Sequence, residues 1–180
     1  MPPEYTAVII HAPIGGGKTQ TCQTLAARAK VCGIRVNGII SRCVKSGEDT
    51  VGYDGVDISQ GEVCPLVRLN AEGDDWFSHG IMKYRFSKSG FLRANKILSS
   101  TRFERSLVIV DEYGRLERGG EGLSPGFTAL SRELRSGVLA VACRGDLVDH
   151  VKSLLYTDDI YVYKAGELEA IWSLVVDRLL

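Results

Sequence analysis

A glycine-rich segment near the start of the chain constrains the fold more than any other feature. It runs from Ala12 to Thr19, and three consecutive glycines immediately precede Lys18. The apolar run Thr6 to His11 before it predicts a buried parallel strand, because the run is short and ends at a turn signal. The helix formers from Lys18 to Lys30 predict a helix that stops near Gly33. This order of strand, tight turn and helix is typical of an α/β fold.

The same segment has the residue pattern of a phosphate-binding P-loop, with alanine in the first glycine position. Consecutive glycines allow a turn whose backbone N–H groups point at a phosphate, and the helix that follows adds its positive end. Lys18 is then expected to bridge the β and γ phosphates, and the Thr19 hydroxyl to bind Mg²⁺. The residues predicted to contact the nucleotide are Ala12, Pro13, Ile14, Gly15, Gly16, Gly17, Lys18, Thr19 and Gln20.

A second motif lies in the middle of the chain, where the apolar run Leu107 to Val110 is followed by Asp111-Glu112. It has the form of a Walker B strand, which brings two carboxylates to the carboxyl end of a buried strand. In a doubly wound sheet that end lies near the P-loop. We therefore expect Asp111 to hold Mg²⁺ through a water, and Glu112 to position and deprotonate the attacking water.

A third positive charge is usually needed near the γ phosphate. Arg42, Arg115 and Arg144 each follow a predicted strand and are all candidates. The pattern does not choose among them, and we take Arg115 and Arg144 as the candidate catalytic pair.

The remaining pattern predicts alternating strands and helices in one domain over residues 1–180, folded as a three-layer α/β/α sandwich of the P-loop NTPase type. The sheet is expected to be mainly parallel with added antiparallel hairpin strands. The hairpins are expected between Ser41 and Leu69, with breaks at 46–49, at Gly52 and Gly55, and at 59–61. The other expected elements are a strand at 34–40, helices at 91–98, 128–135, 146–155 and 167–180, and strands at 138–143 and 160–163.

Composition excludes several classes of protein. Twenty-two basic and twenty-two acidic residues cancel, so nothing draws the whole molecule to nucleic acid or to a membrane. The apolar run near the start is too short for a signal peptide or a membrane span. The five cysteines are scattered, which argues against disulfides and zinc and favours reduced thiols in the cytoplasm. We expect a monomer.

One region is locally basic. Residues 79–105 contain seven Lys or Arg against the single acid Glu104, with aromatic residues between them. A protein partner could dock through this stretch.

With its P-loop, its Gly38-Ile39-Ile40-Ser41 segment and its run Val110 to Glu117, the chain resembles the small P-loop nucleoside-triphosphatase family of the thermophile type. The resemblance implies slow, Mg²⁺-dependent hydrolysis of several nucleoside triphosphates, ATP and GTP among them, with weak base discrimination. Lys164 and the turn Ala165-Gly166 could flank the base. The departures are Ala12 in place of glycine and Arg115 in place of lysine, which exchanges a point charge for a planar fork.

Two other functions remain open from the sequence. In a nucleoside or nucleotide kinase, residues 79–105 would supply a lid and an acceptor site. In a nucleotide-switched adaptor, hydrolysis would act as a timer and the basic stretch would be a docking surface.

Overall fold

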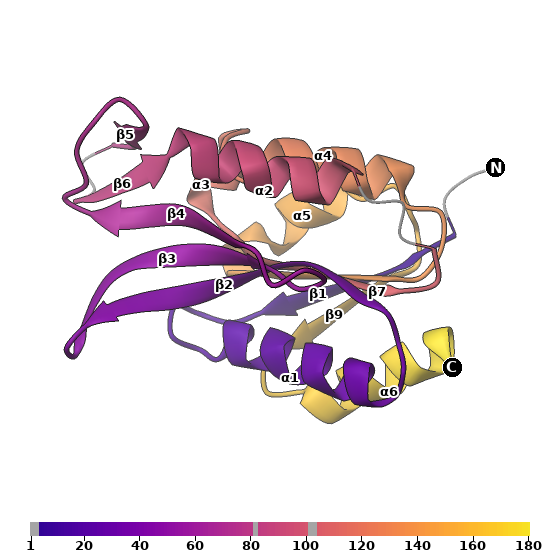
Figure 1. Cartoon of the computed structure of the whole chain (residues 1–180). Helices are drawn as coiled ribbons and strands as arrows, with labels where there is room; N and C mark the ends of the chain where they lie inside the picture. Colours follow the sequence, from indigo (N-terminus) through magenta and orange to yellow (C-terminus); the bar gives the residue numbers. More distant parts are fainter. Residues whose placement is uncertain (1–3, 81–82, 101–103) are drawn as a thin grey trace.

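The computed structural model describes residues 4–80, 83–100 and 104–180. In these residues the chain forms a nine-stranded sheet in the order β5-β6-β4-β3-β2-β7-β8-β1-β9. Helices cover both sides of the sheet, with α1 and α6 on one face and α2, α4 and α5 on the other (Figure 1). The structure therefore confirms the predicted α/β sandwich.

The parallel half of the sheet carries the two motifs. Its strands are β1 (Thr6–His11), β2 (Val36–Ser46), β7 (Leu107–Tyr113), β8 (Val138–Cys143) and β9 (Ile160–Lys164). β8 lies between β1 and β7 and pairs in parallel with both, so one strand separates the P-loop strand from the Asp111 strand. Neighbouring strands lie about 4.8 Å apart, so the two motifs are separated by roughly two strand spacings.

An antiparallel extension continues the sheet beyond β2. Its strands are β3 (Asp49–Asp57), β4 (Val63–Leu69), β5 (Trp76–Ser78) and β6 (Tyr84–Ser87). The hairpin turns predicted at 46–49 and 59–61 are confirmed, whereas the breaks predicted at Gly52 and Gly55 are wrong, because both residues lie inside β3. A Cβ on Gly52 would lie 2.1 Å from the Val67 carbonyl oxygen, so this glycine allows close approach of β4 and does not end a strand.

The helices are α1 (Lys18–Val31), α2 (Lys88–Ser100), α3 (Arg115–Arg118), α4 (Ser124–Glu133), α5 (Val148–Ser153) and α6 (Leu168–Leu179), with a short 3-10 turn, η1 (Gly145–Leu147), before α5. Two apolar clusters fill the layers. One joins alternate residues of the strands to α2, α4 and α5, and the other joins the opposite faces of those strands to α1 and α6. In the described part of the chain no helix is long and apolar enough to span a membrane.

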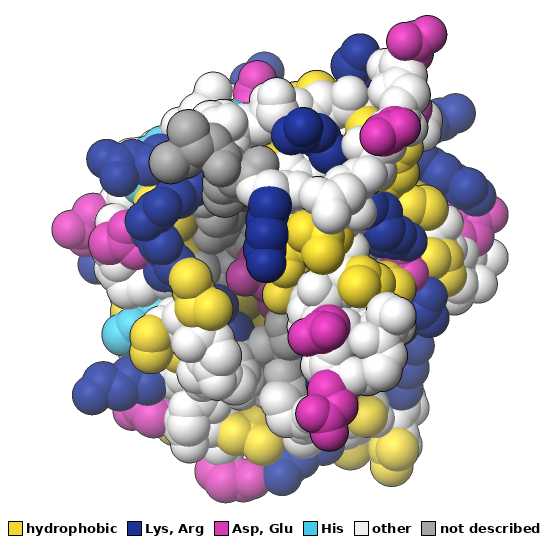
Figure 2. Space-filling view, turned by 90° about the vertical axis from the view of Figure 1, so that its left-hand side faces the viewer, with side chains coloured by type: hydrophobic (Ala, Val, Ile, Leu, Met, Phe, Trp, Pro, Cys, Tyr) yellow, Lys and Arg dark blue, Asp and Glu magenta, His cyan; other side chains and the backbone are white. Residues whose placement is uncertain are grey.

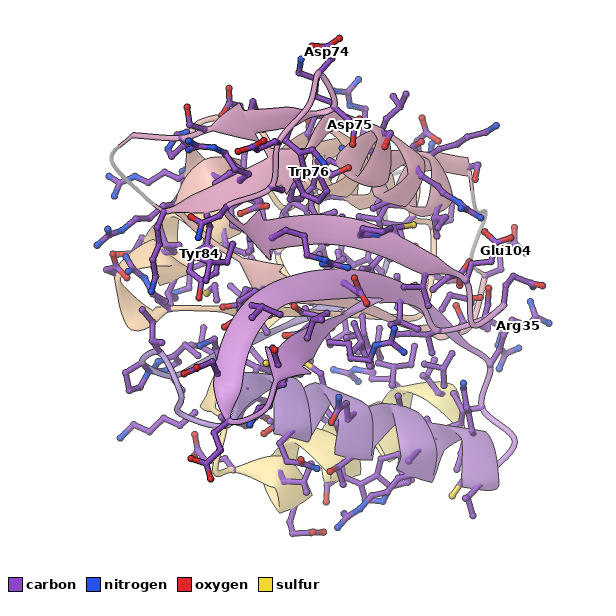
Figure 3. The ribbon with its side chains drawn as sticks, turned by 60° about the vertical axis from the view of Figure 1, so that its left-hand side comes forward. Arg35, Asp74, Asp75, Trp76, Tyr84 and Glu104 are labelled. Carbon is purple, nitrogen blue, oxygen red and sulfur yellow. The ribbon has the colours of Figure 1, made fainter. Side chains whose placement is uncertain are left out.

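The carboxyl ends of the parallel strands meet at one edge of the sheet, toward the left in Figure 1, and the β2–β3 hairpin projects beyond them. Figure 2 looks onto this edge, and Lys and Arg side chains border it on several sides. Both sequence motifs end at this edge, which therefore carries the candidate site.

Candidate functional site

The P-loop takes the conformation that its glycines predict. Gly15 and Gly17 have φ values of 74° and 85°, in the left-handed region where a side chain is strained. Gly16 is required for a different reason, since a Cβ there would lie 2.7 Å from the Ala12 Cβ and 2.9 Å from the Pro13 carbonyl oxygen. Each of the three glycines is therefore needed to form the turn.

Alanine in the first position of the loop is compatible with this turn. Among the described non-glycine residues, positive φ occurs at Asn70, Arg105 and Glu112, and Ala12 is not one of them. The departure from the usual glycine therefore introduces no backbone strain at Ala12.

Lys18 begins α1 and is 6% exposed. Its Nζ donates hydrogen bonds to the carbonyl oxygens of Ala12 at 3.3 Å and Pro13 at 3.1 Å, which hold the ammonium group over the loop. Thr21, a residue without a predicted role, links the start of the helix to the turn after β9, because its single O–H lies within hydrogen-bond distance of two carbonyl oxygens, those of Ala165 at 2.8 Å and Gly17 at 3.0 Å.

The turn after β9 lies beside the P-loop. His11 at the end of β1 lies opposite Lys164 at the end of β9 in the parallel pairing of these strands. The Ala165 N–H donates to the His11 carbonyl oxygen at 3.1 Å. Gln20 is exposed on the first turn of α1, where its Nε2 contacts the Thr24 hydroxyl at 3.4 Å. The turn after β9 thus lies close to the P-loop. The contact of this turn with a nucleotide base remains a prediction.

Asp111 is buried at the end of β7, with 2% of its surface exposed. The Ser41 backbone N–H donates to Asp111 Oδ2 at 3.1 Å, whereas Oδ1 has no hydrogen-bond partner among the described residues. Burial above all, together with the nearby Glu112 charge, raises the pKa of the Asp111 carboxyl to about 7, although Thr19, Ser41 and Lys18 act to lower it.

These oxygens suit a magnesium ion that also binds phosphate. Mg²⁺ usually takes one or two protein oxygens, together with water and substrate phosphates. Asp111 provides a buried carboxylate oxygen without a partner, and Thr19 interacts with the same carboxylate. In the described ranges no group of three or more His, Cys, Asp or Glu could hold a metal ion.

Glu112 has an unusual backbone conformation. Its φ is 73°, and the pairing of β7 with β8 shifts register between Val110 and Tyr113, which marks a bulge at this residue. Bulges re-aim side chains, and left-handed non-glycine residues are concentrated at functional sites. The bulge leaves Glu112 exposed, directly after the buried Asp111.

Arg144, one of the three candidate arginines, lines a pocket together with residues of the P-loop. The pocket measures about 620 Å³, and its lining residues are His11, Ala12, Pro13, Ile14, Arg144, Gly145 and Asp146. The Arg144 guanidinium pairs with Asp146 through Nη2, and its buried Nε has no hydrogen-bond partner within the described residues. Arg144 is therefore held at the edge of the loop with one donor unused.

The other two candidates lie elsewhere. The expectation that Arg42 follows a strand is wrong, because β2 continues to Ser46. The Arg42 side chain pairs with Asp54 on β3 at 3.0 Å, and Arg68 on β4 pairs with the same carboxylate. Arg115 is exposed at the start of α3, three residues after Glu112.

The basic segment predicted as a lid or docking surface is partly built into the fold. Its described residues include β6 and α2, and four of their apolar side chains, Phe86, Phe91, Ala94 and Leu98, are buried in the core. Residues 81–82 and 101–103 of this segment lie outside the described residues. The sequence did not predict β5 or β6, because these strands are short and flank charged residues.

The cysteines are free in the described chain, with Cys22, Cys64 and Cys143 buried. Cys22 lies in α1, and burial raises the pKa of its thiol well above the usual value. A buried thiol that resists ionisation suits a packing residue, and the reduced state of the thiols remains a prediction.

Comparisons with known proteins bear on the family and the fold. The model of the NTPase family matches residues 7–164. The solution structure of a human cancer-related nucleoside triphosphatase aligns with a TM-score of 0.73 and 19% identity, covering 96% of this chain and 98% of that one. The crystal structure of THEP1 from the hyperthermophile Aquifex aeolicus aligns with a TM-score of 0.64 and 17% identity, covering 95% and 98%. A search among curated proteins finds no significant match.

Proposed function

This chain belongs to the NTPase family and is an NTP-hydrolysing enzyme, and we propose that it converts nucleoside triphosphates to diphosphate and phosphate with Mg²⁺ and with broad base tolerance. The observation that carries the proposal is the adjacent pair at the end of β7. Asp111 is buried with a free carboxylate oxygen, and Glu112 is turned outward by the bulge. Asp111 thus has an environment suited to metal binding, and Glu112 has one suited to proton transfer.

Each residue has a distinct role in the proposed reaction. The loop N–H groups and Lys18 bind the phosphates, and Asp111 and Thr19 hold Mg²⁺, which neutralises phosphate charge when bound. Glu112 accepts a proton from water as the water oxygen bonds to the γ phosphorus. The bond from that phosphorus to the bridging oxygen breaks, and the diphosphate leaves with its electron pair.

Arg144 best supplies the additional positive charge. Its guanidinium lines the same pocket as Pro13 and Ile14, and Asp146 limits its motion. Charge preorganised beside a reacting phosphate contributes more than charge that must be immobilised during reaction. Arg115 is the second candidate, since it is exposed near Glu112.

Broad base tolerance has indirect support from the turn after β9. The Lys164 backbone N–H donates to Glu167 Oε2 at 2.6 Å, and the Ala165 backbone is bonded to His11 and Thr21. These groups are already paired within the protein, which leaves few donors and acceptors to distinguish one base from another.

Packing of the basic segment favours hydrolysis over transfer to an acceptor. A kinase lid must move over the phosphates, but α2 packs against α4 and β4 through buried side chains. We further propose that residues 1–180 act as a single domain and as a monomer in the cytoplasm, where the free cysteines stay reduced. A protein partner at residues 79–105 remains a prediction.

Release of inorganic phosphate tests the proposal. It is measured with ATP, GTP, CTP and UTP, with and without Mg²⁺, for the parent, Glu112→Gln and the exposed control Glu72→Gln. We expect slow Mg²⁺-dependent release with every base, retained in the control and reduced by on the order of a hundredfold or more in Glu112→Gln. Parent-rate release by Glu112→Gln would exclude Glu112 as the base. Transfer of a labelled γ phosphate to a nucleoside or a nucleoside monophosphate would identify a kinase.

A further inference from the structure

The proposed mechanism does not use one buried acid near the site, Glu117. It is 6% exposed, and its two carboxylate oxygens accept backbone N–H groups from opposite ends of one loop. Gly114 N donates to Oε2 at 2.8 Å, and Leu123 N donates to Oε1 at 3.1 Å. This carboxylate therefore closes the loop 114–123, which follows β7 and contains the short helix α3.

The loop is built around this carboxylate. A Cβ on Gly122 would lie 2.1 Å from Glu117 Oε1, and one on Gly114 would lie 3.3 Å from Oε2, so two glycines leave room for it. Among the described residues no lysine, arginine or histidine forms an ion pair with Glu117. A buried carboxylate without a cation is costly to keep, and the two backbone donors offset this cost only in part.

The loop is also tied to the end of β7. The Tyr113 side chain is 1% exposed, and its hydroxyl donates to the Glu117 carbonyl oxygen at 3.2 Å. The same hydroxyl lies 3.4 Å from both Ser124 Oγ and His150 Nε2. Tyr113, directly after Glu112, is thus held by the Glu117 backbone, and Gly114, the next residue, is held by the Glu117 side chain.

Glu117 therefore anchors the chain on the C-terminal side of a strained residue. Glu112, with its φ of 73°, lies two residues before Gly114, and Arg115 lies between the two anchored N–H groups. Left-handed conformations at non-glycine residues persist only where the surrounding structure imposes them. We propose that Glu117 is a positioning residue, which holds Glu112 in the geometry for hydrolysis and does not itself touch the substrate.

This inference rests on the proposed function and predicts a specific kinetic effect. In Glu117→Gln one acceptor oxygen becomes an NH₂ group that faces a backbone N–H, so one end of the loop is released. We expect kcat for ATP with Mg²⁺ to fall by roughly ten- to hundredfold, as expected for a small displacement of catalytic groups. KM should stay within about twofold, because the P-loop is unaffected. Glu121→Gln, which removes an exposed carboxylate from the same loop, is the matched control and should keep the parent kcat.

A double-mutant cycle separates this inference from the proposed function. If Glu117 acts through Glu112, then Glu112→Gln/Glu117→Gln should be no slower than Glu112→Gln alone. Parent-rate turnover by Glu112→Gln refutes the proposed function, whatever Glu117→Gln does. Loss of turnover in Glu112→Gln with an unchanged kcat in Glu117→Gln, or with effects that multiply, refutes only the positioning role.

Thermal unfolding of each variant guards against simple loss of the fold. Glu117→Asp, which keeps the charge but is too short to reach both N–H groups, repeats the kinetic test if Glu117→Gln does not fold. If neither variant folds, Glu117 serves the fold alone and the positioning role is wrong.

Discussion

The Ser41 backbone N–H donates a hydrogen bond to Asp111 Oδ2 at 3.1 Å, and this contact determines which oxygen of the carboxylate is free. β2 and β7 are parallel neighbours, and β2 continues past the end of their pairing, which brings Ser41 beside Asp111. Oδ1 is left without a hydrogen-bond partner in the described structure. The strand that begins the antiparallel extension therefore also orients the proposed metal ligand.

The buried Asp111 predicts an inverse dependence of stability on pH. Its pKa is raised from 3.8 to about 7 in the folded protein, so between these values the folded state keeps a proton that the unfolded state releases. Stability contributed by the neutral acid is present below about pH 4 and is lost as pH rises to about 7, by on the order of 4 kcal/mol in total. Burial also raises the pKa of Glu117, which acts in the same direction.

Urea unfolding at pH 5, 6, 7 and 8 without Mg²⁺ measures this dependence. We expect Asp111→Asn to flatten most of the decline between pH 5 and 7. An equally steep decline in the variant would show that other groups cause it. Added Mg²⁺ and nucleotide should stabilise the parent at pH 8 more than Asp111→Asn, since a ligand stabilises the state that binds it.

The left-handed backbone of Glu112 predicts a trade of activity for stability. Glycine adopts a φ of 73° without strain, so Glu112→Gly should raise the free energy of unfolding by about 1 kcal/mol and abolish most turnover. Glu72→Gly is the control, because Glu72 is exposed and does not have a positive φ. In Glu72→Gly the added backbone freedom of the unfolded chain should lower the free energy of unfolding. Destabilisation of both variants by similar amounts would argue that Glu112 is not strained.

Arg144 is predicted to contribute to catalysis more than Arg115. Arg144→Ala should lower kcat by on the order of a hundredfold, because it removes a preorganised charge beside the loop. Arg115→Ala should have a smaller effect, since that side chain is exposed. Arg93→Ala is the control, because it also removes one positive charge but breaks only the surface ion pair with Glu62. If Arg115→Ala proves the more damaging of the two variants, Arg115 is the residue that completes the site.

The sequence predicted the residues of the site better than their environments. The P-loop and Asp111-Glu112 are local patterns whose flanking strands and helix follow from hydrophobic periodicity, so they could be placed on the sheet. The free oxygen of Asp111 depends on Ser41, seventy residues away. The bulge at Glu112 depends on pairing with β8, and the Arg42 pair depends on Asp54 across the hairpin. Such contacts are set by sheet register, which local pattern does not specify.

The extension of the sheet shows the same limit. β5 and β6 contain only three and four residues, so their alternation is too short to detect. Gly52 and Gly55 indicated breaks because glycine is rare within strands, but here they allow β4 to approach. Only residues 91–98 of helix α2 were predicted as helical, and the apolar residues there recur at helical spacing.

The packing inside the P-loop predicts that Gly16 tolerates no side chain. In Gly16→Ala the added Cβ would meet the Ala12 Cβ at 2.7 Å and the Pro13 carbonyl oxygen at 2.9 Å, so the loop must open. The two carbonyls that hold Lys18 would then move, and we expect nucleotide affinity to fall by at least about tenfold, measured by titration with a fluorescent ATP analogue. Glu72→Ala is the control, because Glu72 is exposed and lies outside both the P-loop and the turn after β9. Equal affinity in the two variants would mean that the loop accommodates the methyl group and that its observed shape is not what binds phosphate.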